Sequence, residues 1–287
     1  MKVSVVVCTK NEEQNIGRCL KSLLEQDYPG ENLEIIVVDN NSLDRTRSIA
    51  RQYTENIHRL ADEVDLSGVK NFRGAQLNLG VKKAAGEIIF YPDADMTFDP
   101  RLIKQAVDLL EGRDALYVPE VVHGHGLFGR IRNFERGFYN ATCVDAVRFV
   151  KKSIFESVGG FDEKKVVFGF DDWDFTKTLK KRDYRLGTTV EKLHHHEEGL
   201  TLGSYVIKKR DYAKTFESYL EKWGREDPDV RRQFSLYYRF LKVFVEEGRW
   251  RRVLSKPHLA LGMFCLRILV GLSFLSGKIS ASSLWKD

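Results

Sequence analysis

Apolar residues in the first hundred positions follow two periodicities, that of a strand and that of a helix. Runs of β-branched and aromatic residues predict strands at 3–8, 34–39 and 87–92. Apolar residues at helical spacing predict helices at 11–26, 45–53 and 76–85. No hairpin signal separates consecutive strands, so each helix is expected to be a right-handed crossover between parallel strands. The pattern predicts an α/β fold with a largely parallel sheet.

The second half of the chain is patterned less regularly. The segment 122–140 mixes glycine, basic and aromatic residues and is expected to form a mobile loop with a short helix. Three helical segments are expected after residue 205, at 212–220, 231–247 and 258–277. This change in character predicts two domains. They are an α/β domain at 1–205 and a helical, basic and hydrophobic segment at 206–287.

Charge and cysteine content narrow the function classes. Residues 1–207 carry 29 Lys and Arg against 32 Asp and Glu, whereas residues 208–287 carry 17 against 9. A near-neutral body with a basic end is expected to bind an anionic surface. Because no RNA-binding motif accompanies the basic end, we expect that surface to be a membrane and not a nucleic acid. Four scattered cysteines, and a first apolar run too short for a signal peptide, predict a protein on the cytoplasmic side.

Polar residues follow each of the three predicted strands. They are Thr9-Lys10-Asn11-Glu12, Asp39-Asn40-Asn41-Ser42 and Asp93-Ala94-Asp95. Since the carboxyl ends of parallel strands meet at one edge, these clusters are expected to converge on one ligand crevice. Asp93 and Asp95 would point to the same side, where a divalent cation would relieve their repulsion; a solvated acidic turn is the alternative. Neither a G-x-G-x-x-G nor a Walker A sequence follows the first predicted strand, which argues against dehydrogenases and P-loop enzymes.

Five motifs then occur in order over roughly residues 1–200: SVVVCTKNEE, IIVVDNNSLDRT, NLGVKKAAGEIIFYPDAD, GGFDE and GFDDWDF. In this order they resemble the family 2 glycosyltransferases of GT-A fold, and the DADMTFDP stretch is similar to the polyprenyl-phosphate mannosyltransferase branch. The resemblance implies metal-dependent, inverting transfer of a hexose from a nucleotide diphosphate sugar, with mannose from GDP-mannose expected first, to a hydrophobic or lipid-linked acceptor. The alternatives are a UDP-sugar transferase with a soluble saccharide acceptor, a sugar-phosphate nucleotidyltransferase and a non-catalytic nucleotide-binding scaffold.

The resemblance also implies which residues bind the donor. Those expected to contact the nucleotide sugar are Thr9, Asn11, Glu12, Asp39, Asn41, Arg73, Asn78, Asp93 and Arg210. Asp95 is the expected principal ligand of Mn²⁺ or Mg²⁺, with Asp93 on the ribose or on the metal through water. Lys209 or Arg210 would close over the phosphates. The residues themselves leave open that Thr9 and Asn11 cap a helix and that Asp39 forms a turn.

The segment FGFDDWDF at 168–175 holds three acids in four residues. Inverting glycosyl transfer needs a carboxylate that accepts the proton of the acceptor hydroxyl. The resemblance assigns this role to Asp172, with Asp171 next in line, and places Asp174 at a helix start. An acidic helix N-terminus is the alternative for the group as a whole.

A histidine run, KLHHHEEG at 192–199, is the last candidate for the metal site. One imidazole beside two carboxylates is a reasonable site for Mn²⁺. His194 and His196 share one side of an extended segment, and the resemblance favours one of these two over His195. A solvated strand end is the alternative, and it fits His195 best.

The apolar stretch 258–277 is just long enough to span a bilayer, but Arg267 near its centre is penalised there. Basic residues at 249–256 favour a location in the headgroup layer, peripheral or monotopic, at the cytoplasmic face of the cell membrane. Packing on the catalytic domain or on a second subunit, as in a homodimer, is the alternative.

Overall fold

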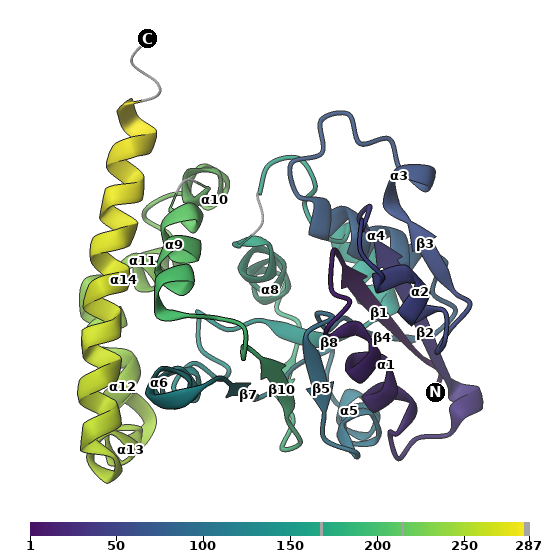
Figure 1. Ribbon diagram of the computed structural model, residues 1–287, viewed down its shortest axis with the longest axis horizontal. Helices are drawn as coiled ribbons and strands as arrows, with labels where there is room; N and C mark the ends of the chain where they lie inside the picture. Colours follow the sequence, from purple (N-terminus) through teal and green to yellow (C-terminus); the bar gives the residue numbers. More distant parts are fainter. Residues whose placement is uncertain (167–168, 214, 284–287) are drawn as a thin grey trace.

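The computed structural model describes residues 1–166, 169–213 and 215–283, and its centre is a seven-stranded sheet in the order β3-β2-β1-β4-β8-β6-β9 (Figure 1). The strands are β1 Val3–Thr9, β2 Leu33–Asp39, β3 Ile57–Arg59, β4 Ile88–Phe90, β6 Ala115–Tyr117, β8 Val147–Lys151 and β9 Leu186–Thr188. β3, β2, β1 and β4 run parallel, β8 is antiparallel to both of its neighbours, and β9 is parallel to β6. The predicted α/β fold with a largely parallel sheet is confirmed.

A second sheet of three strands lies beside the carboxyl edge of the first. Its strands are β5 Met96–Phe98, β10 Leu193–His196 and β7 Glu120–His123, with β10 in the middle. β10 pairs antiparallel with β5, where His195 lies opposite Met96. It pairs parallel with β7, where Leu193 lies opposite Glu120. This small sheet therefore brings the histidine run next to the segment that follows Asp95.

Helices cover both faces of the large sheet because its strands alternate buried side chains between the two faces. The helices of this part are α1 Ile16–Leu24, α2 Thr46–Ala50, α3 Leu60–Glu63, α4 Phe72–Lys83, α5 Leu102–Leu110, α6 Gly126–Arg136, α7 Lys152–Val158 and α8 Asp171–Lys181. In β1, Val5 and Val7 pack with α1 and α5, whereas Val6 packs with α4. A Cβ at Gly80 of α4 would lie only 2.2 Å from Val6 Cγ1, so glycine permits this close approach.

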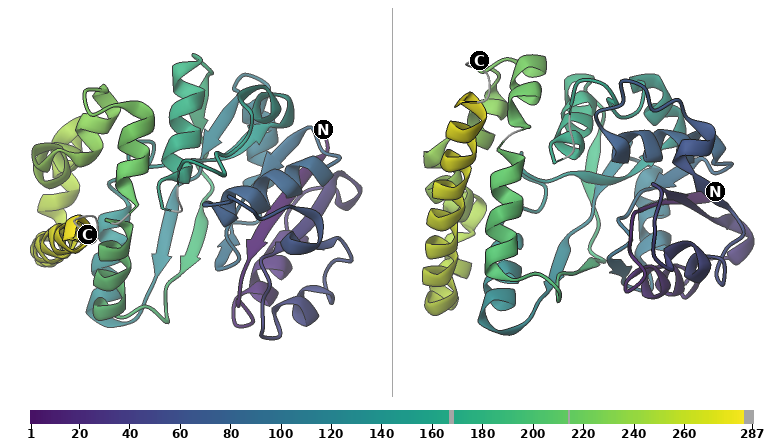
Figure 2. Two further views of the ribbon diagram at one scale, coloured as in Figure 1. Left: turned by 90° about the horizontal axis from the view of Figure 1, so that it is seen from above. Right: turned by 45° about the horizontal axis from the view of Figure 1, so that its top comes forward.

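The remainder of the chain is helical. Its helices are α9 Leu202–Tyr212, α10 Phe216–Trp223, α11 Pro228–Phe234, the π-helix η2 Tyr238–Lys242, α12 Val243–Val245, α13 Trp250–Ser255 and α14 Pro257–Ser283. The long α14 packs against α6 and α9, and α9 stands between α14 and the sheets (Figures 1 and 2). The predicted boundary at residue 205 falls inside α9, and the division into two domains stays a prediction.

The prediction for 122–140 was right in part, and the prediction for 231–247 was wrong. The segment 122–140 contains the expected helix, α6, together with the end of β7, and Ile131 and Phe134 of α6 bury an apolar stripe against α14 and η2. The single helix predicted at 231–247 is divided, because Ser235 has extended backbone torsions (φ −70°, ψ 126°) and ends α11. Apolar spacing continues across that break, which is why the sequence pattern alone did not reveal it.

Candidate active site

The polar clusters after β1, β2 and β4 meet at one edge of the large sheet, as predicted. Thr9 lies opposite Asp39 in the register of β1 and β2, and Cys8 forms an isolated bridge with Asp93. The convergence follows from the parallel order of these strands.

Asp39 and Thr9 present buried polar atoms without a partner in the described part of the chain. The Asp39 side chain is fully buried; its Oδ2 accepts a hydrogen bond from the Ser42 amide at 3.0 Å and lies 3.6 Å from Arg47 Nε. Its Oδ1 and the Thr9 hydroxyl have no partner there. A buried unpaired acceptor is costly, so these atoms mark a place for ligand donors. The turn expected as the alternative for Asp39 uses only one of its two oxygens.

Asn11 and Asn41 shape the loops around this place. Both have left-handed torsions, with φ of 56° and 54°, which asparagine tolerates better than most residues. Asn11 Oδ1 accepts from the Leu43 amide at 2.9 Å, and Asn41 Oδ1 accepts from Arg59 at 3.4 Å. Helix capping by Asn11 was the alternative, but α1 begins only at Ile16.

Glu12 stands at the same edge. Its carboxylate accepts from Asn15 at 2.7 Å. Burial, together with the nearby Asp95 and Asp93, raises the pKa of Glu12 despite that hydrogen bond. A cation bound in this crevice would therefore lower the repulsion among three carboxylates.

Two buried arginines hold the acids of the site in a single ion network. Arg73 Nε lies 2.9 Å from Asp93 Oδ1, and its Nη1 lies 2.9 Å from Asp172 Oδ1 and 3.2 Å from Asp171 Oδ2. Arg148, on β8, lies 3.4 Å from Asp93 and 3.6 Å from Asp172. Burial alone would raise the pKa of Asp93, but Arg73 and Arg148 outweigh it and hold that pKa at about 2. Burial raises the pKa of Asp171 in spite of Arg73.

Arg148 was missed by sequence reasoning, since a lone arginine in a strand carries no local signal of a site. The Nη2 of Arg73 is buried and unpartnered among the described residues, so it can donate to a bound ligand. Phe168, which begins the acidic motif, lies outside the described residues.

Asn78 and Arg210, both predicted to bind the donor, are placed away from this network. The Asn78 amide bonds to the backbone of Phe161 in both directions at 2.9 Å and to Glu163 at 2.6 Å, so it ties α4 to the loop that follows α7. Arg210 is exposed on α9. These two roles receive no support from the geometry.

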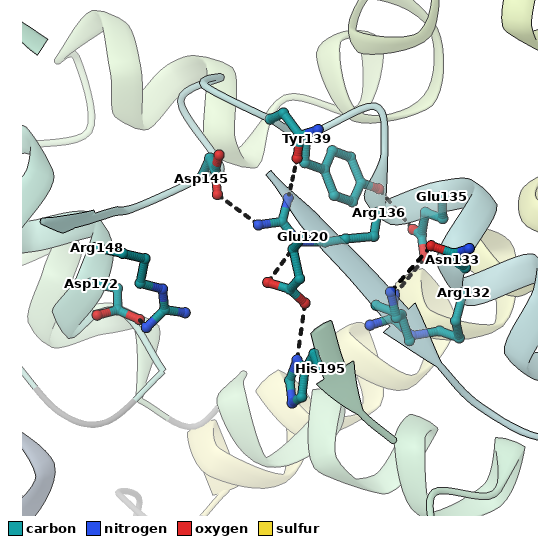
Figure 3. A network of polar contacts seen from close by, with 12 residues as sticks. Glu120, Arg132, Asn133, Glu135, Arg136, Tyr139, Asp145, Arg148, Asp172 and His195 are labelled. Carbon is teal, nitrogen blue, oxygen red and sulfur yellow. Dashed lines mark hydrogen bonds and ion pairs between the residues drawn. The ribbon is translucent and has the colours of Figure 1, made fainter. Parts of the chain in front are cut away.

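The histidine nearest to the acids is His195, not His194 or His196. His195 Nε2 lies 3.1 Å from Asp95 Oδ2. On its other side, His195 Nδ1 lies 2.9 Å from Glu120 Oε1 (Figure 3). The other two do share one side of β10, as predicted, but it is the opposite side. They contact Asp99, His123, Thr97 and Glu198. The sequence did contain a signal, because His195 shares a face with Leu193, which is fully buried in the core.

Glu120 connects His195 to further charged residues on the side away from Asp95. Its buried carboxylate also lies 3.0 Å from Arg136 Nε, and Arg136 pairs with Asp145 at 2.8 Å (Figure 3). Burial would lower the pKa of His195, but Asp95 and Glu120 outweigh it and raise that pKa well above its usual range. The imidazole is thus held between two carboxylates.

The ligand atoms around Asp95 fit a divalent cation. Asp95 Oδ1 is buried and has no partner among the described residues, and carboxylate oxygen is the ligand that Mg²⁺ and Mn²⁺ prefer. His195 could add a nitrogen by releasing Asp95 Oδ2 and losing the proton that the bound ion would replace, whereas Asp93 is engaged by two arginines. No group of three potential protein ligands occurs in the described ranges, so most of the coordination would come from substrate phosphates and water.

Next to the acids opens a cavity of about 950 Å³ that is polar at one end and apolar at the other. Asp172, Arg148 and His195 line the polar end, with Lys208 and Lys209 of α9. Burial, then Arg132 and Lys208, lower the pKa of Lys209 to about 7. The apolar walls come from the helices of the C-terminal part: Phe216, Leu220, Phe234, Phe240, Ile268, Leu272, Phe274 and Leu275.

Comparisons with known proteins agree with this fold. The family described as glycosyl transferase family 2 matches residues 4–161, more than half of the chain. The chain is 26% identical over 244 residues to beta-monoglucosyldiacylglycerol synthase of Synechocystis sp. and 27% identical over 247 residues to glycosyltransferase AglE of Haloferax volcanii. These matches cover 77% and 82% of the chain, and 49% and 78% of the relatives, so the chain spans about half the length of the synthase.

Among solved structures, the chain is similar to mannosyltransferase PcManGT from Pyrobaculum calidifontis in complex with GDP-Man and Mn²⁺. The TM-score is 0.64 at 21% identity, covering 100% of this chain and 88% of that one. The S. aureus TarS structure gives a TM-score of 0.54 at 20% identity, covering 98% of this chain and 55% of that one. At these identities the likeness shows the shared fold.

Proposed function

The chain belongs to glycosyltransferase family 2, and we propose that it transfers a hexose from a nucleotide diphosphate sugar to an amphiphilic, lipid-linked acceptor at a membrane surface. Mannose from GDP-mannose is the donor proposed first, and PcManGT, solved with GDP-Man and Mn²⁺, supports that choice by its fold. The synthase relative is named for a diacylglycerol product, which supports the lipid acceptor.

On the donor side, the unpaired oxygen of Asp39 would accept hydrogen bonds from the base, and the Thr9 hydroxyl lies beside it. Arg73 Nη2 would donate to the phosphates or the sugar. Asp95, with His195, would hold Mn²⁺ or Mg²⁺. Such an ion neutralises charge on a diphosphate leaving group when it is bound.

On the acceptor side, Asp172 is the proposed general base. It lies at the polar end of the cavity, and its two oxygens are fixed by Arg73 at 2.9 Å and Arg148 at 3.6 Å. These two contacts hold the carboxylate in one orientation at the cavity wall, where it can accept a proton from a hydroxyl placed in the cavity. Asp171 is 4% exposed and bonds to the Gly169 amide, which suits it to a supporting role.

The cavity itself is the observation that carries the lipid acceptor. A soluble saccharide would need polar walls, whereas aromatic and aliphatic side chains line the far end here. A membrane location is supported by α14, on which Leu261, Leu269 and Leu272 are 45–68% exposed. A 20-residue window of α14, Pro257–Ser276, is long and apolar enough to cross a membrane, which is weak evidence by itself.

Asp172→Asn tests the proposal, because the amide is nearly isosteric and cannot act as a base. We expect the rate of sugar transfer to acceptors in a lipid extract, reconstituted in phospholipid vesicles, to fall at least about 100-fold. The Mn²⁺-dependent rise in the protein's melting temperature with GDP or UDP should stay unchanged. The two nucleotides also separate the GDP-mannose proposal from its UDP-sugar alternative. Wild-type turnover in Asp172→Asn would move the base elsewhere, and no stabilisation by either nucleotide would refute the donor class.

A further inference from the structure

The apolar end of the cavity reaches the protein surface beside α14. Leu236, Ile268, Leu272 and Leu275 line the cavity, yet each of them is 52–74% exposed. Residues that line a cavity and are also open to solvent mark its mouth. The mouth therefore lies between α14 and the stretch 236–240, which includes the start of η2.

The surface around this mouth is apolar and is followed by basic residues. Leu261 and Leu269 extend the exposed apolar face of α14, and Leu241 adds to it from η2. Lys and Arg at 249–256 precede the N-terminus of α14. An apolar face next to a basic cluster complements a bilayer that contains anionic lipid. Water at such a mouth would be surrounded mostly by the apolar side chains of the protein. The geometry therefore favours lipid chains over water next to the mouth.

The cavity is also rich in cations. Its whole lining contains nine arginines and lysines but five carboxylates. Most of these arginines pair with carboxylates, whereas Lys208, Lys209 and Arg239 have no carboxylate partner in the described part of the chain. Lys209 instead lies over the ring of Tyr205 at 5.3 Å, and Arg239 over that of Tyr139 at 5.5 Å. An anionic group entering the cavity would find Lys208 and Arg239 without a carboxylate partner among the described residues, and its charge would favour the protonated form of Lys209, whose pKa burial otherwise lowers to about 7.

We propose that the mouth between α14 and residues 236–240 is a lateral portal through which the acceptor, an anionic amphiphile, keeps its hydrocarbon chain in the bilayer while its head group binds at Lys208 and Lys209. The inference deepens the proposed function and rests on it. It assigns the exposed face of α14 to lipid, and a second copy of the chain covering that face is the competing occupant.

Gly271 makes the portal testable. It lines the cavity on the turn of α14 that faces η2, and a Cβ there would lie 3.7 Å from Phe240 Cζ. That distance is ordinary van der Waals contact, so the backbone accepts a side chain, but a large one would extend into the mouth. Leu269, two residues away, is 45% exposed and does not line the cavity, so it offers a matched control.

The probe is 11-(dansylamino)undecanoic acid, a fluorescent anion on a hydrocarbon chain, with the corresponding neutral alcohol for comparison. Wild type and Leu269→Trp should bind the acid with equal affinity, and Gly271→Trp should bind it at least about tenfold more weakly. The double variant Lys208→Gln/Lys209→Gln should lose the preference for acid over alcohol. In vesicles containing diazirine-labelled phosphatidylglycerol, crosslinks should map to Leu236 and Leu272.

Equal affinity of Gly271→Trp and Leu269→Trp would overturn the portal. So would a dimer, seen by light scattering in detergent, in which these crosslinks are replaced by contacts between copies. A nucleotide-induced thermal shift in each variant shows that the fold and the donor side are intact. If that shift is present and the probe does not bind, the portal alone fails; if nucleotides do not stabilise wild type, the proposed function fails.

Discussion

Arg267→Met tests whether a buried charge docks α14 on the rest of the protein. The Arg267 side chain is 6% exposed, and its Nη1 donates to Glu135 Oε1 at 2.9 Å and to the Tyr139 hydroxyl. Its guanidinium carbon also lies 5.2 Å from the ring centres of Phe240 and Phe244. Methionine keeps the apolar contacts of the stem but removes one of the two arginines that pair with Glu135.

The magnitude follows from the partners that remain. Removing one member of a buried ion pair costs about 3–5 kcal/mol, but Arg132 stays 2.9 Å from the other oxygen of Glu135. Burial would raise the pKa of Glu135, yet Arg132 and Arg267 outweigh it and lower that pKa from 4.5 to about 2. Such a shift corresponds to roughly 3 kcal/mol, shared between the two arginines. With the lost cation–π contacts, we expect the free energy of unfolding to fall by about 2 kcal/mol.

The pH dependence has a definite sign. Because the pKa of Glu135 is lower in the folded than in the unfolded state, its ionisation stabilises the fold fully above pH 4.5, and this stabilisation is lost as the pH falls toward 2. Arg267→Met moves the folded-state pKa of Glu135 back toward 4.5. The variant and wild type should therefore differ most above about pH 5 and converge in acid.

Urea unfolding in a mild detergent, followed by tryptophan fluorescence, measures the effect. Combining Arg267→Met with Glu135→Gln completes a double-mutant cycle, in which we expect a coupling of at least about 1 kcal/mol. Arg251→Met removes an exposed arginine from α13 and should change the unfolding free energy by less than about 0.5 kcal/mol. An Arg267→Met variant as stable as Arg251→Met, with no coupling to Glu135, would show that this pair does not dock α14.

Two further predictions concern the metal and the membrane. Asp95→Ala should abolish the Mn²⁺-dependent part of the nucleotide affinity measured by calorimetry. Asp99→Ala, which removes the partner of His194, is the control and should leave that affinity unchanged. If Asp95→Ala binds nucleotide with the same Mn²⁺-dependent affinity as wild type, Asp95 is not the metal ligand. Replacing Arg251 and Lys256, which are both exposed, by glutamine should weaken flotation with anionic vesicles, by ~1 kcal/mol for each charge near the surface, and added salt should shrink the difference. Flotation unaffected by either change would assign membrane binding to the apolar face alone.

The sheet and the positions of its polar clusters were predictable because they depend on local pattern and chain order. Strand and helix periodicity near Val3–Thr9 and Leu33–Asp39 is strong, and consecutive crossovers leave few alternative topologies. Asp39, Asp93 and Asp95 then had to lie near one another. The local sequence pattern could not reveal that Arg148 pairs with the acids of the site. That pairing depends on the position of β8, which runs antiparallel next to β4 in the sheet.

The histidine run shows a different limit. Alternation along an extended segment was predicted correctly, but which side faces Asp95 depends on the pairing of β10 with β5 and β7. A one-residue change in register would exchange His195 for its neighbours. The burial of Leu193 fixes the register, and a sequence argument that weighed Leu193 as a core residue would have chosen His195.

The acceptor side was the least predictable part, because its walls come from segments far apart in the sequence. Arg267 was treated as a penalty within an apolar helix, yet its partner Glu135 lies 132 positions away on α6. The same pair explains why α14 can be apolar on its outer face and still remain attached to the protein, since the charge is buried inward and the exposed leucines face outward. A hydropathy average merges these two faces into one candidate span. Once they are separated, α14 becomes a wall of the cavity on one side and a surface suited to lipid on the other, which is the arrangement that a lipid-linked acceptor would need.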